Sequence, residues 1–138
     1  MSRVVLLICF MLFVGCSTPQ HSWPRQERNT VWTAMIAAAK SPDYDADDPR
    51  KRWIVVENKV DVNPKIGKIL VRRKLGRSLK LPMQVEQYDE RDWFFTIQLL
   101  PQNTPTVTFD TVNQVMVPAQ VQDEAQRYFN LIDELVGN

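Results

Sequence analysis

The sequence predicts an α+β fold: a two-layer sandwich in which one antiparallel sheet of about four strands is flanked by an N-terminal and a C-terminal helix. Apolar residues recur at helical spacing near both ends of the expected globular part, and the residues between them form short β-branched or alternating runs. Because the strands follow one another without helices between them, the expected order is α-β-β-β-β-α, with both helices on one face. Residues 29–138 are therefore expected to form a single domain.

The first helix is expected over Thr30–Lys40, where apolar side chains recur at a helical period. Asn29 or Thr30 offers a side-chain oxygen to the free amides of the first turn. Ser41-Pro42 should end the helix, because proline disfavours the helical conformation in the residue before it.

A β-hairpin should follow, with Trp53–Val60 and Lys68–Lys74 as its strands. The residues Asn63–Gly67 between them favour a turn, since Pro64 presets φ and Gly67 accepts a left-handed conformation. Two further strands are expected in Arg91–Leu100 and Thr106–Asp110.

Arg91–Leu100 has the clearest strand pattern of the sequence, because its apolar side chains alternate with more polar ones. Thr106–Asp110 lies between a proline and a polar turn, and Val115–Val117 is a candidate extension of it. The final helix is expected from about Ala119 to Val136. Pro118 suits its start and Gly137 its end.

The N-terminus predicts export. Arg3 precedes an uncharged apolar run, Val4–Val14, which ends at Gly15-Cys16. A basic start, an apolar stretch of about 7–15 residues and a small residue at the cut are typical of a secretory signal, and such a stretch is too short to span a bilayer. Phe13–Cys16 resembles the bacterial lipobox. The resemblance implies that residues 1–15 are a cleaved signal peptide and that Cys16 carries lipid, which holds the chain on a membrane.

The resemblance also implies a place in the cell envelope. Ser17 stands where an aspartate would retain a lipoprotein in the inner membrane, so the outer membrane, facing the periplasm, is expected if the cell is Gram-negative. Residues 16–28 are polar with two prolines and are expected to form a lipidated tether, which could reach about 40 Å when extended. Cys9 would leave with the signal, so neither a disulfide nor a cysteine-bound metal is expected. Export also argues against a nucleic acid partner.

A second resemblance concerns the fold. In the helix-grip domains of outer-membrane assembly lipoproteins, a helix that begins near Val-Trp leads into a hairpin whose second strand is Gly-x-Ile-x-Val. Residues 30–75 are similar, with Val31-Trp32 and Gly67–Val71 at the corresponding places. The resemblance supports the expected fold rather than a function.

The charges are distributed unevenly. Residues 50–80 carry eleven basic groups against two acidic ones, whereas residues 81–138 carry two basic and nine acidic groups. A basic patch could attract an acidic protein, a lipid headgroup or a glycolipid. The candidate patch comprises Lys68, Arg72, Arg73, Lys74, Arg77 and Lys80. The alternative is that the basic hairpin lies beside the acidic strand region and that the charges neutralise one another; that region contains Glu86, Asp89, Glu90 and Asp92.

Strand alternation divides the second strand of the hairpin between two faces. Lys68, Arg72 and Lys74 are expected to project from the same face, while Ile69 and Val71 point into the core. Reversing Arg72 and Lys74 to glutamate should therefore leave the fold intact.

No catalytic, cofactor or metal site is predicted. The lone histidine, His21, falls in the expected tether, and the four glycines form no phosphate-binding loop. Asp43–Asp48 begins like a calcium-binding loop, but Asp48 replaces the turn glycine and Ile54 stands where the bidentate glutamate belongs. A non-enzymatic interaction or assembly module is therefore expected.

The alternative function is a binding domain for an amphiphilic or anionic envelope ligand, either a lipid or a glycolipid. Such a ligand would occupy a cavity between the sheet and the helices. The aromatic residues that could line it are Trp32, Trp93, Phe94, Phe95 and Phe129.

Overall fold

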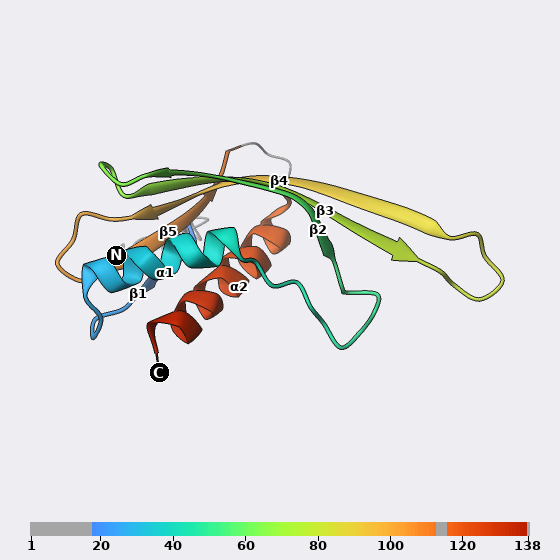
Figure 1. The fold of residues 1–138 in the computed structure, drawn as a ribbon, viewed down its shortest axis with the longest axis horizontal. Coiled ribbons are helices and arrows are strands. Elements are labelled where there is room, and N and C mark those ends of the chain that lie inside the picture. The colour runs from blue at the N-terminus through green and yellow to red at the C-terminus, as the bar shows by residue number, and fades with distance from the viewer. Residues whose placement is uncertain (1–17, 113–115, 138) are drawn as a thin grey trace, which may run out of the picture.

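The computed structural model describes residues 18–112 and 116–137, and within them the chain forms five strands and two helices (Figure 1). The helices are α1 (Arg28–Lys40) and α2 (Pro118–Val136). The strands are β1 (Gln20–Ser22), β2 (Ile54–Asn63), β3 (Lys68–Leu79), β4 (Gln87–Leu99) and β5 (Thr106–Thr111). The predicted α+β class is confirmed, with one strand more than expected.

All five strands belong to one antiparallel sheet in the order β1-β5-β4-β3-β2. The predicted turn between β2 and β3 is present, and Gly67 in it has a φ of 64°. Its carbonyl accepts a hydrogen bond from the Leu99 amide at 2.8 Å. A side chain at Gly67 would place its Cβ 2.9 Å from the Leu99 carbonyl oxygen, so both the backbone conformation and the close packing favour glycine.

Both helices cover the same face of the sheet, which we call the inner face (Figure 1). The opposite, outer face carries no helix in the described part of the chain. The alternation predicted for β4 is confirmed, because Trp93, Phe95, Ile97 and Leu99 are all buried on the inner face. The Phe95 ring stacks on that of Phe109 in β5, with 4.6 Å between the centroids. Burial of this apolar surface against α1 and α2 stabilises the fold by roughly 25 cal/mol per Å².

The expected tether over residues 16–28 is shorter in the structure, because its second half is folded. Gln20–Ser22 pair with β5, and Trp23 is buried with its indole nitrogen donating to Asp133. His21 is also packed rather than solvated, since its ring centroid lies 4.5 Å from that of Trp23 and 5.7 Å from that of Phe129. A strand of three residues is too short to show a period in the sequence.

Two smaller expectations are also corrected. The first helix begins at Arg28, so neither Asn29 nor Thr30 caps it. Val115 lies outside the described residues, and Val117 precedes α2 instead of extending β5.

The strands β3 and β4 continue beyond the part of the sheet that the helices cover. Figure 1 shows them running on as a twisted two-stranded projection, which we call the hairpin arm (residues 76–90). Its pairing continues to Leu79 opposite Gln87. The loop between α1 and β2 contacts the base of the arm, where Arg77 donates to the carbonyl of Arg50.

Candidate functional site

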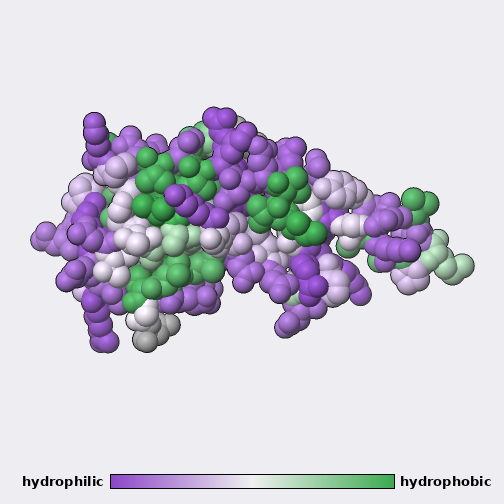
Figure 2. All heavy atoms as spheres, in the orientation of Figure 1, coloured by the Kyte–Doolittle hydropathy of each residue, from purple (hydrophilic) through white to green (hydrophobic). Residues whose placement is uncertain are grey.

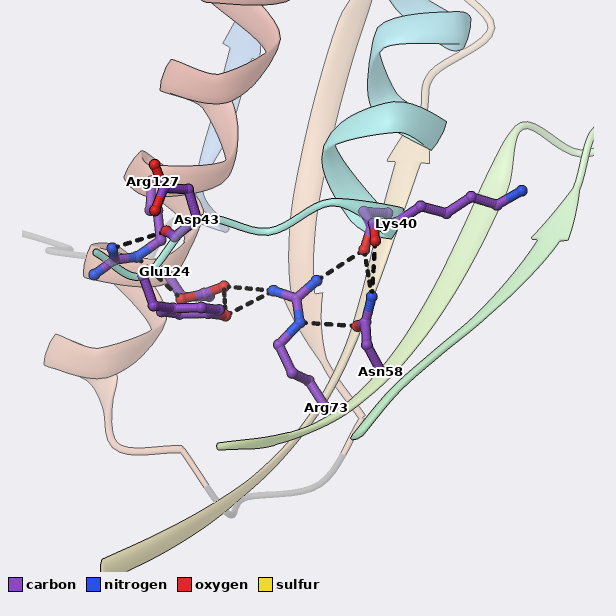
Figure 3. A network of polar contacts seen from close by, with 8 residues as sticks. Lys40, Asp43, Asn58, Arg73, Glu124 and Arg127 are labelled. Carbon is purple, nitrogen blue, oxygen red and sulfur yellow. Dashed lines mark hydrogen bonds and ion pairs between the residues drawn. The ribbon is translucent and has the colours of Figure 1, made fainter. Parts of the chain in front are cut away.

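A polar network is buried where the helices meet the sheet (Figure 3). At its centre is Arg73 of β3, which is only 3% exposed. Its Nη1 lies 3.1 Å from Oε1 of Glu124 and donates to the Tyr44 phenol oxygen at 2.6 Å. Its Nε donates to Oδ1 of Asn58 at 2.9 Å, and its Nη2 to the carbonyl of Ala39 at 3.0 Å. One side chain thus connects α1, the loop after it, β2, β3 and α2.

Burial shifts the acid–base properties of this network. It raises the pKa of the Glu124 carboxyl, against the opposing effects of the Tyr44 hydrogen bond and the Arg73 and Arg127 charges. Burial likewise raises the pKa of the Tyr44 phenol far above its ordinary value, and the Glu124 charge acts in the same direction. Tyr44 therefore remains protonated and donates to Glu124 Oε1 at 2.6 Å.

Beside this network lies a hollow of about 240 Å³, which we call the Trp53 pocket. It lies between the inner face at the base of the hairpin arm, the α1–β2 loop and the first half of α2. The lining residues are basic (Lys51, Arg77, Arg91, Arg127), acidic (Asp123, Glu124), aromatic (Tyr44, Trp53, Trp93) and one amide, Gln120.

Trp53 orients two arginines in the wall of the pocket. The guanidinium carbons of Arg77 and Arg91 lie 4.4 and 4.5 Å from the centroid of its ring. Arg77 also donates twice to Oδ2 of Asp89, its register partner on β4, at 3.0 and 3.1 Å. Arg91 has no acidic partner among the described residues, so its charge is available to a ligand.

The pocket combines surplus positive charge with an unsatisfied acceptor. Four basic side chains and two acidic ones line the pocket. Arg77 is already paired with Asp89, and Arg127 with Glu124. The surplus charge therefore comes from Lys51 and Arg91, which face Asp123. In the described part of the chain, Oε2 of Glu124 and Nε of Arg127 are buried without hydrogen-bond partners and lie 3.6 Å apart. Unmet buried polar atoms are costly. A ligand with an anionic group for Arg91 and Lys51 and a hydroxyl or amine beside Glu124 would suit this lining.

Part of the predicted basic patch lies on the outer face. Lys68, Arg72 and Lys74 project there as predicted, while Ile69 and Val71 are fully buried on the inner face. This confirms the face assignment that strand alternation gave.

The outer face is hollowed around Arg72, with an open volume of about 500 Å³. The Arg72 guanidinium lies 4.7 Å from the centroid of the Phe94 ring. Nearby, Lys59 pairs with Glu57 at 2.7 Å, so part of the local charge is neutralised. This hollow is more open than the Trp53 pocket, and each of the two is lined by four basic and two acidic residues.

The remaining patch residues lie elsewhere, so the six do not form one surface. Arg73 and Arg77 are in phase with the buried residues of β3, and both therefore point to the inner face. Arg73 is enclosed in the core, and Arg77 lines the Trp53 pocket. Lys80 follows β3 in the connection to β4. The alternative expectation, that acidic residues of the neighbouring strand neutralise the basic ones, holds for Arg77, which pairs with Asp89 of β4.

In the acidic loop Asp43–Asp48, two carboxylates accept hydrogen bonds from backbone amides nearby in the sequence. Asp43 accepts a hydrogen bond from the Asp45 amide, and Asp48 accepts one from the Arg50 amide. Within residues 18–112 and 116–137, no group of three His, Cys, Asp or Glu side chains is placed to hold a metal ion.

The aromatic residues expected around a central cavity do not gather at one. Phe95 and Phe129 are packed in the core, whereas Phe94 faces the other side of the sheet. Trp93 lines the Trp53 pocket. Sequence reasoning missed this pocket because Trp53 lies just before β2 and Arg91 was the first residue of the predicted strand, whereas β4 begins at Gln87. Alternation does not show what covers residues at the ends of a predicted strand.

No protein-family model matches the chain, and no curated protein matches it at a significant level. In the part of the chain that the structure describes, neither helix has the length and apolar character needed to cross a membrane. What the Trp53 pocket binds is therefore inferred from its own side chains.

Proposed function

We propose that the chain is a lipid-anchored, non-enzymatic interaction module of the cell envelope, and that it recognises an anionic group in the Trp53 pocket. The surplus of cations fixed around one tryptophan supports this most strongly. Arg77 and Arg91 lie against Trp53, while Lys51 and Arg127 also line the pocket. Guanidinium groups bind carboxylates and phosphates through charge-assisted hydrogen bonds. Because stacking already orders these side chains, less entropy is lost on binding.

The ligand that fits best carries an anionic group beside a hydroxyl or amine. The anion would contact Arg91, and the donor would lie beside Glu124, whose Oε2 is buried 3.6 Å from Nε of Arg127. A phosphorylated or acidic sugar combines both groups on one small framework, as in the headgroup of an envelope glycolipid. A hollow of about 240 Å³ suits a headgroup rather than a whole amphiphile.

The proposed anchor is the lipid on Cys16, which would hold the module on the outer membrane, facing the periplasm, in a Gram-negative cell. The proposed partners are thus the membrane and an anionic envelope molecule, with no cofactor and no nucleic acid.

Calorimetric titration of the full chain in detergent micelles with glucose 6-phosphate tests the pocket. Arg91→Gln should weaken binding about tenfold, the equivalent of one charge-assisted hydrogen bond. Arg72→Gln is the matched control, because Arg72 also stacks on an aromatic ring but lies on the outer face. Added salt should weaken binding by the wild-type chain.

The control also distinguishes the two surfaces. If Arg72→Gln abolished binding and Arg91→Gln left it unchanged, the site would be the outer-face hollow. Binding that survived both substitutions and high salt would contradict recognition of an anion.

The anchor is tested separately by labelling cells with a fatty acid. Cys16→Ser should abolish incorporation of the label. Label retained by the variant would contradict a lipid on Cys16.

A further inference from the structure

The tip of the hairpin arm exposes large apolar side chains. In the connection after β3, Leu81, Met83 and Val85 are 42, 105 and 86% exposed. Figure 2 shows apolar atoms at the far end of the arm, separated from the main body by polar surface. The backbone there is turned back on itself, since the Gln84 amide donates to the Leu81 carbonyl and Met83 has a φ of 63°. The three side chains therefore project from a turn that one backbone hydrogen bond closes.

The topology places this tip on the same side of the fold as the start of the described chain. β1 and β4 are both antiparallel to β5, so they run parallel to each other. The N-terminal ends of both strands therefore face the same direction. The arm tip lies at the N-terminal end of β4. The residues that precede β1 in the sequence join it at its N-terminal end.

The chain from the proposed anchor to the fold is short. Gln20 already pairs with Thr108, and the residues from Cys16 to Gln20 can span at most about 14 Å. A lipid on Cys16 would thus hold the body of the protein close to the bilayer. From Gln98, which is level with Gln20 through Thr108, strand β4 extends roughly 36 Å to Gln87 at about 3.3 Å per residue. The tip extends further from the fold than the segment from Cys16 to Gln20 can reach. Both can therefore contact one bilayer only when the strands are inclined to its plane.

We propose that the arm tip is a second membrane contact, in which Leu81, Met83 and Val85 enter the boundary between headgroups and acyl chains. This inference rests on the proposed lipid anchor. Lys80 lies next to these residues and can remain at the level of the lipid phosphates. Three side chains on a narrow turn offer too little surface for a stable protein interface, whereas shallow insertion in a bilayer needs no complementary groove.

The test uses the full chain, purified with its lipid and reconstituted in vesicles of phosphatidylethanolamine and phosphatidylglycerol. Once the signal is removed and Cys16 acylated, Met83→Cys supplies a single free thiol for an environment-sensitive fluorophore. The matched control is Ile66→Cys, because Ile66 is 55% exposed in the turn at the opposite end of β3. Emission from position 83 should shift to shorter wavelength, and doxyl-labelled lipids should quench it several-fold more than emission from position 66.

Flotation of the vesicles separates failure of the anchor from failure of the tip. If the chain does not float, the anchor proposal fails. Met83→Cys and Ile66→Cys are then each made together with Cys9→Ser and Cys16→Ser, and the chain is attached to chelating lipids through an N-terminal histidine tag, which reports on the tip alone. Equal quenching at positions 66 and 83, or none at position 83, would overturn the inference. A blue shift at position 83 without lipid quenching would indicate burial against protein and would overturn it as well.

Discussion

The helix-covered half of the sheet and the hairpin arm use the same strand in different ways. Arg73 and Arg77 lie four residues apart on the inner face of β3. Arg73 lies under the helices and is buried with Glu124, whereas Arg77 lies at the base of the arm and pairs with Asp89 at the edge of solvent. Strand alternation decides which face a residue occupies, and the cover over that face decides whether it becomes core or binding surface.

The two halves should consequently respond differently to substitution. In the covered half, apolar burial and the enclosed ion pair determine stability. In the arm, backbone pairing and the stacking of Arg77 and Arg91 on Trp53 hold the structure, and the side chains remain available for ligands. The following predictions test this contrast.

The largest effect is expected from Glu124→Gln, which leaves Arg73 buried without a counter-charge. The free energy of unfolding should fall by about 3–5 kcal/mol. Urea denaturation followed by tryptophan fluorescence measures it. The double variant Arg73→Met/Glu124→Leu should recover much of the loss, because it removes both buried charges. A loss under about 1 kcal/mol for Glu124→Gln would mean that water reaches the pair.

Neighbouring phenylalanines on β4 provide the next comparison. Phe95→Ala should destabilise the fold by about 3–5 kcal/mol, because Phe95 is fully buried against Phe109. Phe94→Ala, on the outer face, should remove only its packing with Arg72 and cost less than about 1 kcal/mol. Chemical denaturation of the two variants side by side measures the difference. Equal losses would contradict the assignment of the faces.

Alkaline pH should lower the stability of the fold through a buried phenol, that of Tyr128, which hydrogen-bonds α2 to α1. Tyr128 donates to the Met35 carbonyl, and burial raises its pKa well above the ordinary value. A raised pKa means that the phenol contributes its full stability below a pH of about 10 and loses it as the pH rises further. Tyr128→Phe should cost about 1 kcal/mol at neutral pH. The same variant should lose less stability than the wild type between neutral and alkaline pH. Parallel curves of unfolding free energy against pH would contradict this prediction.

The smallest effect is expected from Asp89→Asn in the arm. Its ion pair with Arg77 is partly exposed, so the loss should be under about 1 kcal/mol and should shrink further at high salt. Thermal unfolding at two ionic strengths measures it. A loss as large as that of Glu124→Gln would place the arm in the same cooperative unit as the core.

The sequence predicted the elements whose pattern is long and regular. The alternation of β4 and most of the apolar stripe of α2 gave the correct faces, because each recurs over several turns or pairs. Leu135, expected in the buried stripe of the last helix, is exposed. The strand β1 was missed, since three residues show no period and Trp23 is apolar among polar neighbours. Long-range pairing with β5 gives this segment its structure.

The site was less predictable than the fold. The position of Arg73 was available from its phase with Ile69 and Val71, yet the basic run around it favoured a surface patch. Its partner, Glu124, lies 51 residues away on a helix whose other acidic residues are exposed or partly exposed. Sequence spacing gives no sign that such a pair will meet, and the Trp53 pocket depends on the same long-range packing.

The position of β1 has a mechanical consequence for a chain held by lipid on Cys16. β1 is a sheet edge that pairs only with β5, through three residues. A pull on the lipid would run along this strand, so its hydrogen bonds would share the force in shear instead of opening one after another. If β1 and the buried Trp23 both detached, the free segment after Cys16 would lengthen from four residues to those preceding α1 at Arg28, and its reach would grow from about 14 to about 40 Å. Whether this edge strand is attached would then set how far the domain can move from the bilayer under tension.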